Sequence, residues 1–145
     1  MTAPTVRARG FQLAGMPRAL PGWEPGEVEL RCLIVDDSRR FVEAASRLLE
    51  LQGVQVVGTA ETGGQALELA SALRPDVALV DVGLGEESGF DVAGRLEAVP
   101  VIMISTQDAD DFAQLVEASQ AVGFLPKARL SGPAIRELLS GHRGR

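Results

Sequence analysis

Acidic side chains stand at the ends of two short apolar segments of the sequence. Asp36 and Asp37 directly follow the segment 31–35, and Asp81 closes the segment 77–81. Neighbouring carboxylates repel one another unless a cation joins them, and an oxygen-rich pocket with open positions suits Mg²⁺. A metal-bound carboxylate that still faces solvent can attack a phosphoryl group and form an acyl phosphate. Asp81 is the central candidate for this chemistry.

A hydroxyl and an ammonium group stand at the ends of two later apolar segments. Ser105 ends the segment 101–105, and Lys127 lies just past the segment 123–125. Both side chains can donate hydrogen bonds to the oxygens of a phosphoryl group that has reached Asp81. The residue types therefore predict a magnesium-assisted phosphoryl site.

The elements that must bring these side chains together are short apolar runs alternating with amphipathic stretches. We expect strands over 31–35, 54–59, 77–81, 101–105 and 123–125, and helices over 38–51, 64–73, 90–98, 111–121 and 133–140. Apolar strands without polar alternation are typical of a parallel sheet with helices on both faces. The pattern predicts an α/β fold with a doubly wound, five-stranded parallel sheet. In such sheets ligands bind at the carboxyl ends of the strands, where the candidate residues stand.

Composition limits the classes of partner and compartment. The chain has 145 residues, a net charge of −6 and 46% hydrophobic residues, which is enough for one domain with a core. The acidic balance argues against direct binding to nucleic acid or to an anionic membrane. A single cysteine, Cys32, excludes an internal disulfide, and no apolar run approaches the ~18 residues needed to span a bilayer. We therefore expect a cytoplasmic protein without membrane insertion.

The chain divides into three expected parts. Residues 1–29 contain four prolines and four glycines, which predicts a flexible N-terminal arm. Residues 30–141 form the domain, and 142–145 a short tail. Only five residues follow Ser140, so we expect no output domain after it, unless the chain is a piece of a longer regulator.

Four motifs, taken in order, resemble the receiver domain of bacterial two-component response regulators. They are Val35-Asp36-Asp37-Ser38, Asp81-Val82-Gly83-Leu84 with Gly89 downstream, Ile104-Ser105, and Phe124-Leu125-Pro126-Lys127. The resemblance covers about residues 30–141 and implies the flavodoxin-like (βα)5 fold. It implies transfer of a phosphoryl group to Asp81 from a phosphohistidine on a histidine kinase or phosphotransfer protein.

The resemblance also implies a role for each motif residue. Mg²⁺ would be held by the side chains of Asp36, Asp37 and Asp81 and by the backbone carbonyl of Gly83. Ser105 and Lys127 would each contact a phosphoryl oxygen. Phe124 would be the aromatic residue whose rotamer follows the state of Ser105 and so changes a protein-binding face.

That face is expected to lie over the segments 111–121, 123–125 and 133–140, where a downstream protein would dock. We expect a monomer or a homodimer that forms on phosphorylation. Six charged residues of the face are candidates for reciprocal salt bridges in such a dimer: Asp110, Asp111, Glu117, Lys127, Arg129 and Arg136.

Two departures from the family pattern are visible. Gly85 stands where the family typically has a proline, which predicts a more mobile loop over 83–88. The interval from Gly89 to Pro100 is short, which predicts a helix abbreviated by about one turn.

Other functions remain open on the sequence alone. A pseudo-receiver would bind proteins without being phosphorylated, and a receiver fragment would belong to a longer DNA-binding regulator. A phosphatase with an aspartyl nucleophile generally carries a second carboxylate two residues later, and here that position is Gly83. We therefore expect a signalling protein and not an enzyme.

Overall fold

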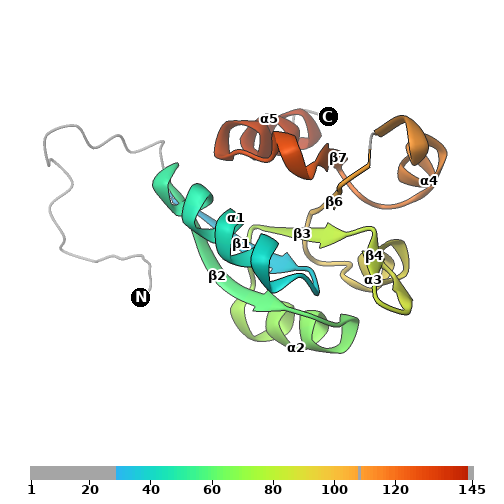
Figure 1. Cartoon of the computed structure of the whole chain (residues 1–145), viewed down its shortest axis with the longest axis horizontal. Helices are drawn as coiled ribbons and strands as arrows, with labels where there is room; N and C mark the ends of the chain where they lie inside the picture. Colours follow the sequence, from blue (N-terminus) through green and yellow to red (C-terminus); the bar gives the residue numbers. More distant parts are fainter. Residues whose placement is uncertain (1–28, 108, 144–145) are drawn as a thin grey trace, which may run out of the picture.

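A five-stranded parallel sheet forms the centre of the molecule, in the order β2-β1-β3-β6-β7 (Figure 1). The computed structural model describes residues 29–107 and 109–143. The strands are β1 (Leu30–Val35), β2 (Val54–Ala60), β3 (Val77–Asp81), β6 (Val101–Ser105) and β7 (Gly123–Pro126). All neighbouring strands of this sheet run parallel. The predicted doubly wound, flavodoxin-like α/β architecture is confirmed.

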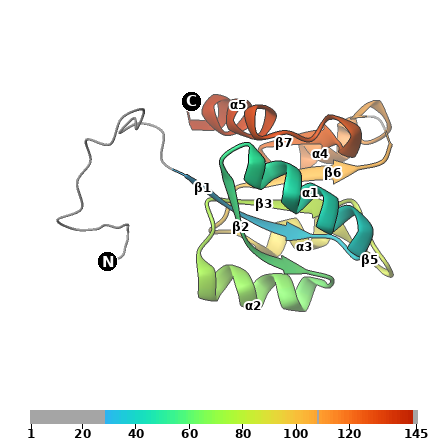
Figure 2. The same ribbon diagram turned by 60° about the vertical axis from the view of Figure 1, so that its left-hand side comes forward.

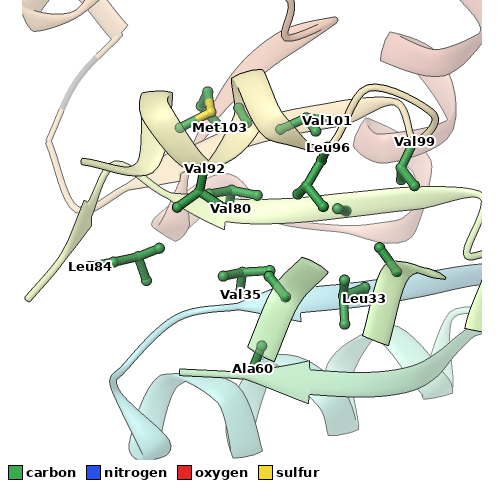
Figure 3. Close-up of a cluster of buried hydrophobic side chains, with 14 residues drawn as sticks. Leu33, Val35, Ala60, Val80, Leu84, Val92, Leu96, Val99, Val101 and Met103 are labelled. Atoms are coloured by element: carbon green, nitrogen blue, oxygen red, sulfur yellow. The ribbon is translucent and has the colours of Figure 1, made fainter. Parts of the chain in front are cut away.

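Helices cover both faces of the sheet (Figure 2). The helices α1 (Arg39–Leu51) and α5 (Gly132–Arg143) pack on one face, and α2 (Gly63–Leu73) and α3 (Gly89–Arg95) pack on the other. Successive strand residues therefore serve different cores: Ile34 lies in the α1/α5 core, and Val35 lies in the α2/α3 core. Figure 3 shows the α2/α3 core, with Val80 and Met103 from neighbouring strands beside Val92 of α3.

Two helices are shorter than the sequence predicts. The helix expected over 90–98 is α3, which ends at Arg95, in keeping with the abbreviation expected from the short interval before Pro100. The helix expected over 111–121 is a short 3₁₀ turn, η1 (Ala109–Asp111), followed by α4 (Ala113–Ala118).

A serine hydroxyl ends α4. Ser119 Oγ donates a hydrogen bond to the carbonyl of Val116 at 2.7 Å and accepts one from the backbone N–H of Ala121 at 3.1 Å. These local bonds satisfy backbone groups that another helical turn would otherwise pair, and the backbone of Ser119 is extended. None of the six residues of α4 is buried.

A short hairpin stands where a mobile loop was expected. The strands β4 (Gly83–Leu84) and β5 (Glu87–Ser88) pair in antiparallel fashion. Gly85 begins the two-residue turn between them with φ of +60°, a left-handed value that glycine adopts without strain. Proline fixes φ near −65° and cannot adopt this backbone, which explains physically why glycine stands here.

Gly85→Pro is accordingly expected to lower the free energy of unfolding by about 1 to 3 kcal/mol, because the hairpin turn must open to accept the ring. Urea denaturation in the presence of EDTA measures the change. Glu86→Gln is the control, because the Glu86 side chain is exposed and the substitution leaves the backbone of the turn unchanged. We expect no change in its free energy of unfolding. Equal stability of Gly85→Pro and the wild-type chain would contradict this account of the turn.

The expected N-terminal arm and C-terminal tail are described by the structure only in part. The arm expected over 1–29 lies outside the described residues, apart from Glu29. The last helix begins at Gly132 and continues to Arg143, so it includes two residues of the expected tail. Among the residues described, every helix is too short or too polar to cross a bilayer.

Candidate functional site

Three carboxylates meet at the carboxyl ends of β1 and β3, which are neighbours in the sheet. Asp36 directly follows β1, and its backbone N–H bonds to the carbonyl of Ala60 at the end of β2. Its Oδ1 accepts a hydrogen bond from the N–H of Ser38 at 2.8 Å. One oxygen atom from each of Asp36, Asp37 and Asp81 lies within 4.8 Å of the others. These strands flank the point where the winding of the sheet reverses, which is where ligands bind in this architecture.

Lys127 brings the positive charge to this cluster. It follows β7 and opens the 3₁₀ turn η2 (Lys127–Arg129). Its Nζ lies 2.6 Å from Asp36 Oδ2 and 3.7 Å from Asp81 Oδ2, and only 12% of its side chain is exposed. It is also the one lysine in the chain. An ammonium is a compact charge with three rotatable donors, whereas a guanidinium is larger and holds its donors in a fixed plane.

One oxygen of the cluster has no satisfying hydrogen bond. Asp36 Oδ2 is the single buried side-chain nitrogen or oxygen among the described residues that lacks a hydrogen-bond partner of good geometry. The Lys127 ammonium, with Nζ 2.6 Å away, forms an ion pair with this oxygen. One ammonium shared between Asp36 and Asp81 leaves the three carboxylates with net negative charge, and a cation among them would relieve their repulsion.

Burial raises the pKa of Asp81 from its usual 3.8 to about 6. The neighbouring Asp36 carboxylate adds to the increase, whereas the Lys127 ammonium and the backbone N–H of Gly83 oppose it. The folded state therefore holds a proton on Asp81 more tightly than the unfolded chain does. As pH rises from about 4 to about 6, ionisation of Asp81 removes stability from the fold.

Asp81→Asn is therefore expected to raise the free energy of unfolding by about 1 to 2 kcal/mol in EDTA above pH ~7. This is less than the full two pKa units imply, because Asp81 keeps some contact with water. Below pH ~4 the advantage of the variant is expected to vanish, because the wild-type carboxyl is then neutral as well. Urea denaturation at both pH values measures the difference, with the exposed Glu86→Gln as control. A variant no more stable than wild type above neutral pH would contradict this electrostatic account.

The predicted switch residues lie on β6 and β7, the two strands that follow β3 in the sheet. Ser105 is buried at the end of β6, next to β3, and its Oγ accepts a hydrogen bond from the N–H of Gln107 at 3.0 Å. Phe124 lies in β7 opposite Met103 of β6. The N–H of Gly83 faces Asp81, and the predicted role of its carbonyl as a metal ligand stays a prediction.

Three residues near the site were missed by reasoning from the sequence. The ring of Phe41 lies under the Lys127 ammonium, with Nζ 4.3 Å from the ring centroid. Phe112 packs between Phe90 and Phe124, with centroid distances of 6.4 and 5.9 Å. The only sequence signal for Phe41 was its place in the first turn of the helix that follows Asp37.

A third missed residue, Glu87, ties the β4–β5 hairpin to two helices. Its Oε2 accepts a hydrogen bond at 3.1 Å from the N–H of Gly63, the first residue of α2, and its Oε1 lies 3.4 Å from Arg95 of α3. The segment that follows Asp81 is thereby held against α2 and α3.

Two of the charged residues expected at a dimer surface are engaged inside this molecule. Lys127 is paired with the carboxylate cluster, and Arg136 donates a hydrogen bond to the carbonyl of Gly53 at 3.1 Å. Lys127 is therefore removed from the set of residues available for salt bridges between two copies.

Comparison with known proteins finds a family that matches most of the described fold. The family model of the response regulator receiver domain matches residues 32–138. The chain is 34% identical over 113 residues to a protein-glutamate methylesterase/protein-glutamine glutaminase of Halobacterium salinarum, a match covering 76% of this chain and 32% of the relative. It is 31% identical over 122 residues to the response regulator GacA of Pseudomonas aeruginosa, covering 79% of this chain and 57% of GacA. The matched part of the chain thus spans about a third of the first relative and somewhat over half of the second.

Solved structures give the same assignment. The signal receiver domain of NarL from Mycobacterium tuberculosis is 33% identical, with a TM-score of 0.69, and the match covers 81% of this chain and 98% of that domain. A CheY-like receiver domain from Methanospirillum hungatei is 20% identical with a TM-score of 0.64, covering 78% of this chain and 92% of that one, and supports the fold alone. The chain belongs to the response regulator receiver domain family of two-component signalling systems.

Proposed function

We propose that Asp81 accepts a phosphoryl group from a phosphohistidine on a histidine kinase or phosphotransfer protein, with Mg²⁺ bound at the carboxylate cluster. The observation that carries this proposal is the convergence of three carboxylates and one mostly buried ammonium at the ends of β1, β3 and β7. Few structural roles require three acids so close together, because their mutual repulsion lowers stability.

The donor set fits Mg²⁺. Asp36, Asp37 and Asp81 offer carboxylate oxygens, the ligands that this hard cation prefers, and one buried oxygen of Asp36 lacks a hydrogen bond. When bound, Mg²⁺ supplies positive charge beside the oxygens of the entering phosphoryl group. A carbonyl oxygen of Gly83 would complete the protein ligands.

The transfer itself needs one nucleophilic oxygen and a leaving group. An Asp81 carboxylate oxygen forms a bond to phosphorus while the phosphorus–nitrogen bond of phosphohistidine breaks, and the electron pair of that bond leaves with the imidazole. With a small acyl phosphate as donor, the phosphorus–oxygen bond breaks and a carboxylate leaves. No oxidant or reductant takes part, and the product on this chain is an aspartyl phosphate.

Ser105 and Lys127 would donate hydrogen bonds to the negatively charged oxygens of the phosphoryl group on Asp81. The Lys127 ammonium already lies 3.7 Å from Asp81 Oδ2, and the Ser105 hydroxyl, which accepts a hydrogen bond from the N–H of Gln107, stands on the adjacent strand end. A phosphoryl group adds about two negative charges and three acceptor oxygens, which attract both donors.

A shift of Ser105 would change the rotamer of Phe124. Phe124 packs on Phe112, at the base of α4, so rotation of its ring would disturb the anchor of that helix. A downstream protein that docks over α4, β7 and α5 would sense the change. Phosphorylation-dependent dimerisation over the same face is the second arrangement that this mechanism allows.

Intact mass after incubation with Mg²⁺ and a small acyl phosphate tests the proposal. A single phosphoryl adduct is expected on the wild-type chain, and it should not form when EDTA is present during the incubation or when Asp81 is replaced in Asp81→Asn. Asp91→Asn is the matched control, because Asp91 is an exposed carboxylate of the nearby helix α3 and its variant should still be phosphorylated. Titration with Mg²⁺ should raise the thermal stability of wild type more than that of Asp81→Asn.

The alternatives predict different products. Wild-type protein that takes up no phosphoryl group from a donor accepted by other receivers would favour a pseudo-receiver that binds proteins by its fold alone. Continuous turnover of a generic phosphate ester would favour an enzyme. Some relatives are named as transcriptional regulators, so the receiver part of a longer DNA-binding regulator stands as an alternative setting for the same chemistry.

A further inference from the structure

The Lys127 ammonium touches an aromatic ring as well as two carboxylates. Its Nζ lies 2.6 Å from Asp36 Oδ2, 3.7 Å from Asp81 Oδ2 and 4.3 Å from the centroid of the Phe41 ring. A cation within about 6 Å of a ring centroid is attracted by the negative face of the ring. That attraction is strongest where water is excluded, and only 12% of the lysine side chain is exposed.

An aromatic face suits this position for a chemical reason. It attracts positive charge without accepting a hydrogen bond of ordinary strength, so it does not take N–H donors away from the oxygens of the site. A fourth carboxylate in the same place would bind the ammonium strongly and add repulsion to a cluster that already holds three acids. The ring therefore restrains the ammonium and leaves its donors available.

The ring is itself held by the start of α1. The backbone N–H of Phe41 donates to Oγ of Ser38, the N-cap residue, at 3.3 Å. The N–H of the same Ser38 donates to Oδ1 of Asp36. Ser38 thus links the backbone of Phe41 to one of the carboxylates, and the Phe41 side chain packs against the α1/α5 core.

We propose that Phe41 is a positioning residue for Lys127: its aromatic face holds the ammonium over the Asp36–Asp81 pair, where a phosphoryl group on Asp81 would meet it. This inference rests on the proposed function for its catalytic consequence. The contact between ring and ammonium is a property of the unphosphorylated protein and can be tested there separately.

Fluorinated phenylalanines at position 41 of the full chain provide a graded test. Each added fluorine withdraws charge from the ring face with little change of shape, so a purely space-filling role would be insensitive to the series. Two quantities are measured for each variant: the rate of phosphoryl incorporation by intact mass, and the NMR signals of the lysine Cε and Nζ in the unphosphorylated protein. Because Lys127 is the one lysine in the chain, those signals need no further assignment.

We expect the rate to fall stepwise, by about three- to tenfold for the most fluorinated ring, and the lysine signals to move in the same order. Phe41→Leu should lower the rate about as much as the most fluorinated ring does. Phe41→Trp should keep the rate close to that of the wild-type chain, since indole binds cations best. The same fluorinated residues at position 112, where the ring neighbours are Phe90 and Phe124, should leave the lysine signals unchanged.

The outcomes separate this inference from the proposed function. Lysine signals that are flat across the series, or a Phe41→Leu chain equal to wild type in signals and rate, would overturn the role of Phe41. Wild-type protein that takes no phosphoryl group would count against the proposed function, and the lysine signals would still decide whether Phe41 positions Lys127.

Discussion

Gly89→Ala is expected to lower the free energy of unfolding by about 3 kcal/mol or more, the largest stability change foreseen for a single methyl group in this chain. A Cβ built on Gly89 would overlap the carbonyl oxygen of Asp81 and come within 2.8 Å of its carbonyl carbon. These are backbone atoms, so no side chain can turn aside to make room. The backbone N–H of Gly89 also bonds to the carbonyl of Val82 at 2.7 Å, which fixes the two segments in close approach.

Two neighbouring glycines serve as matched controls for Gly89→Ala. A Cβ on Gly83, in the same segment, or on Gly94, inside α3, would meet no atom within 4 Å. We expect Gly83→Ala to be nearly neutral and Gly94→Ala to stabilise by about 0.5 to 1 kcal/mol, because alanine favours helix interiors. Urea denaturation of the three variants in EDTA measures the ranking. If Gly89→Ala proved as stable as Gly83→Ala, the close packing of β3 against the start of α3 would be wrong.

Lys127→Met is expected to destabilise the metal-free protein by about 3 kcal/mol. Methionine keeps the length and apolar stem of lysine and packs well on an aromatic ring such as Phe41, so little packing is lost. The substitution removes the ammonium that lies beside Asp36 and Asp81, and the side chain of Asp36 is fully buried. An uncompensated charge in such a place is costly.

Two further measurements show whether charge is the cause of the Lys127→Met effect. The double variant Lys127→Met with Asp36→Asn removes both charges and should recover most of the lost stability. Mg²⁺ should also restore part of it, because it supplies positive charge at the same carboxylates. Arg129→Met, an exposed site two residues along η2, is the control and should change stability little. An effect of Lys127→Met that persists in the double variant would assign the loss to packing instead.

The sheet was predictable because its strands are short apolar runs with clear ends. Their alternating side chains enter two separate cores, so no polar period appears in the sequence, which is the pattern that indicated a parallel sheet. The helix ends were harder to predict. The end of α4 depends on the hydroxyl of Ser119 and not on glycine or proline, so the sequence carries no strong stop signal there.

The position of the site was predictable for a topological reason. The carboxyl ends of neighbouring parallel strands meet at one edge, so residues that follow β1, β3 and β7 come together even though they are far apart in the chain. Contacts within the site were not predictable. The distance from Phe41 to Lys127 depends on how α1 packs against the end of β7, and the positive φ of Gly85 depends on how β4 and β5 pair.

The exposure of α4 has a consequence for the order in which parts of the molecule open. A segment with no buried residue loses little apolar burial when it unfolds, so its opening free energy is far below that of the whole domain. We therefore expect the amides of α4 to exchange with solvent through local unfolding, and those of β1, β3 and β6, which lie between two cores, to exchange only when the domain unfolds. The face above β7 is thus able to rearrange within the native state while the strands that carry the carboxylates stay folded.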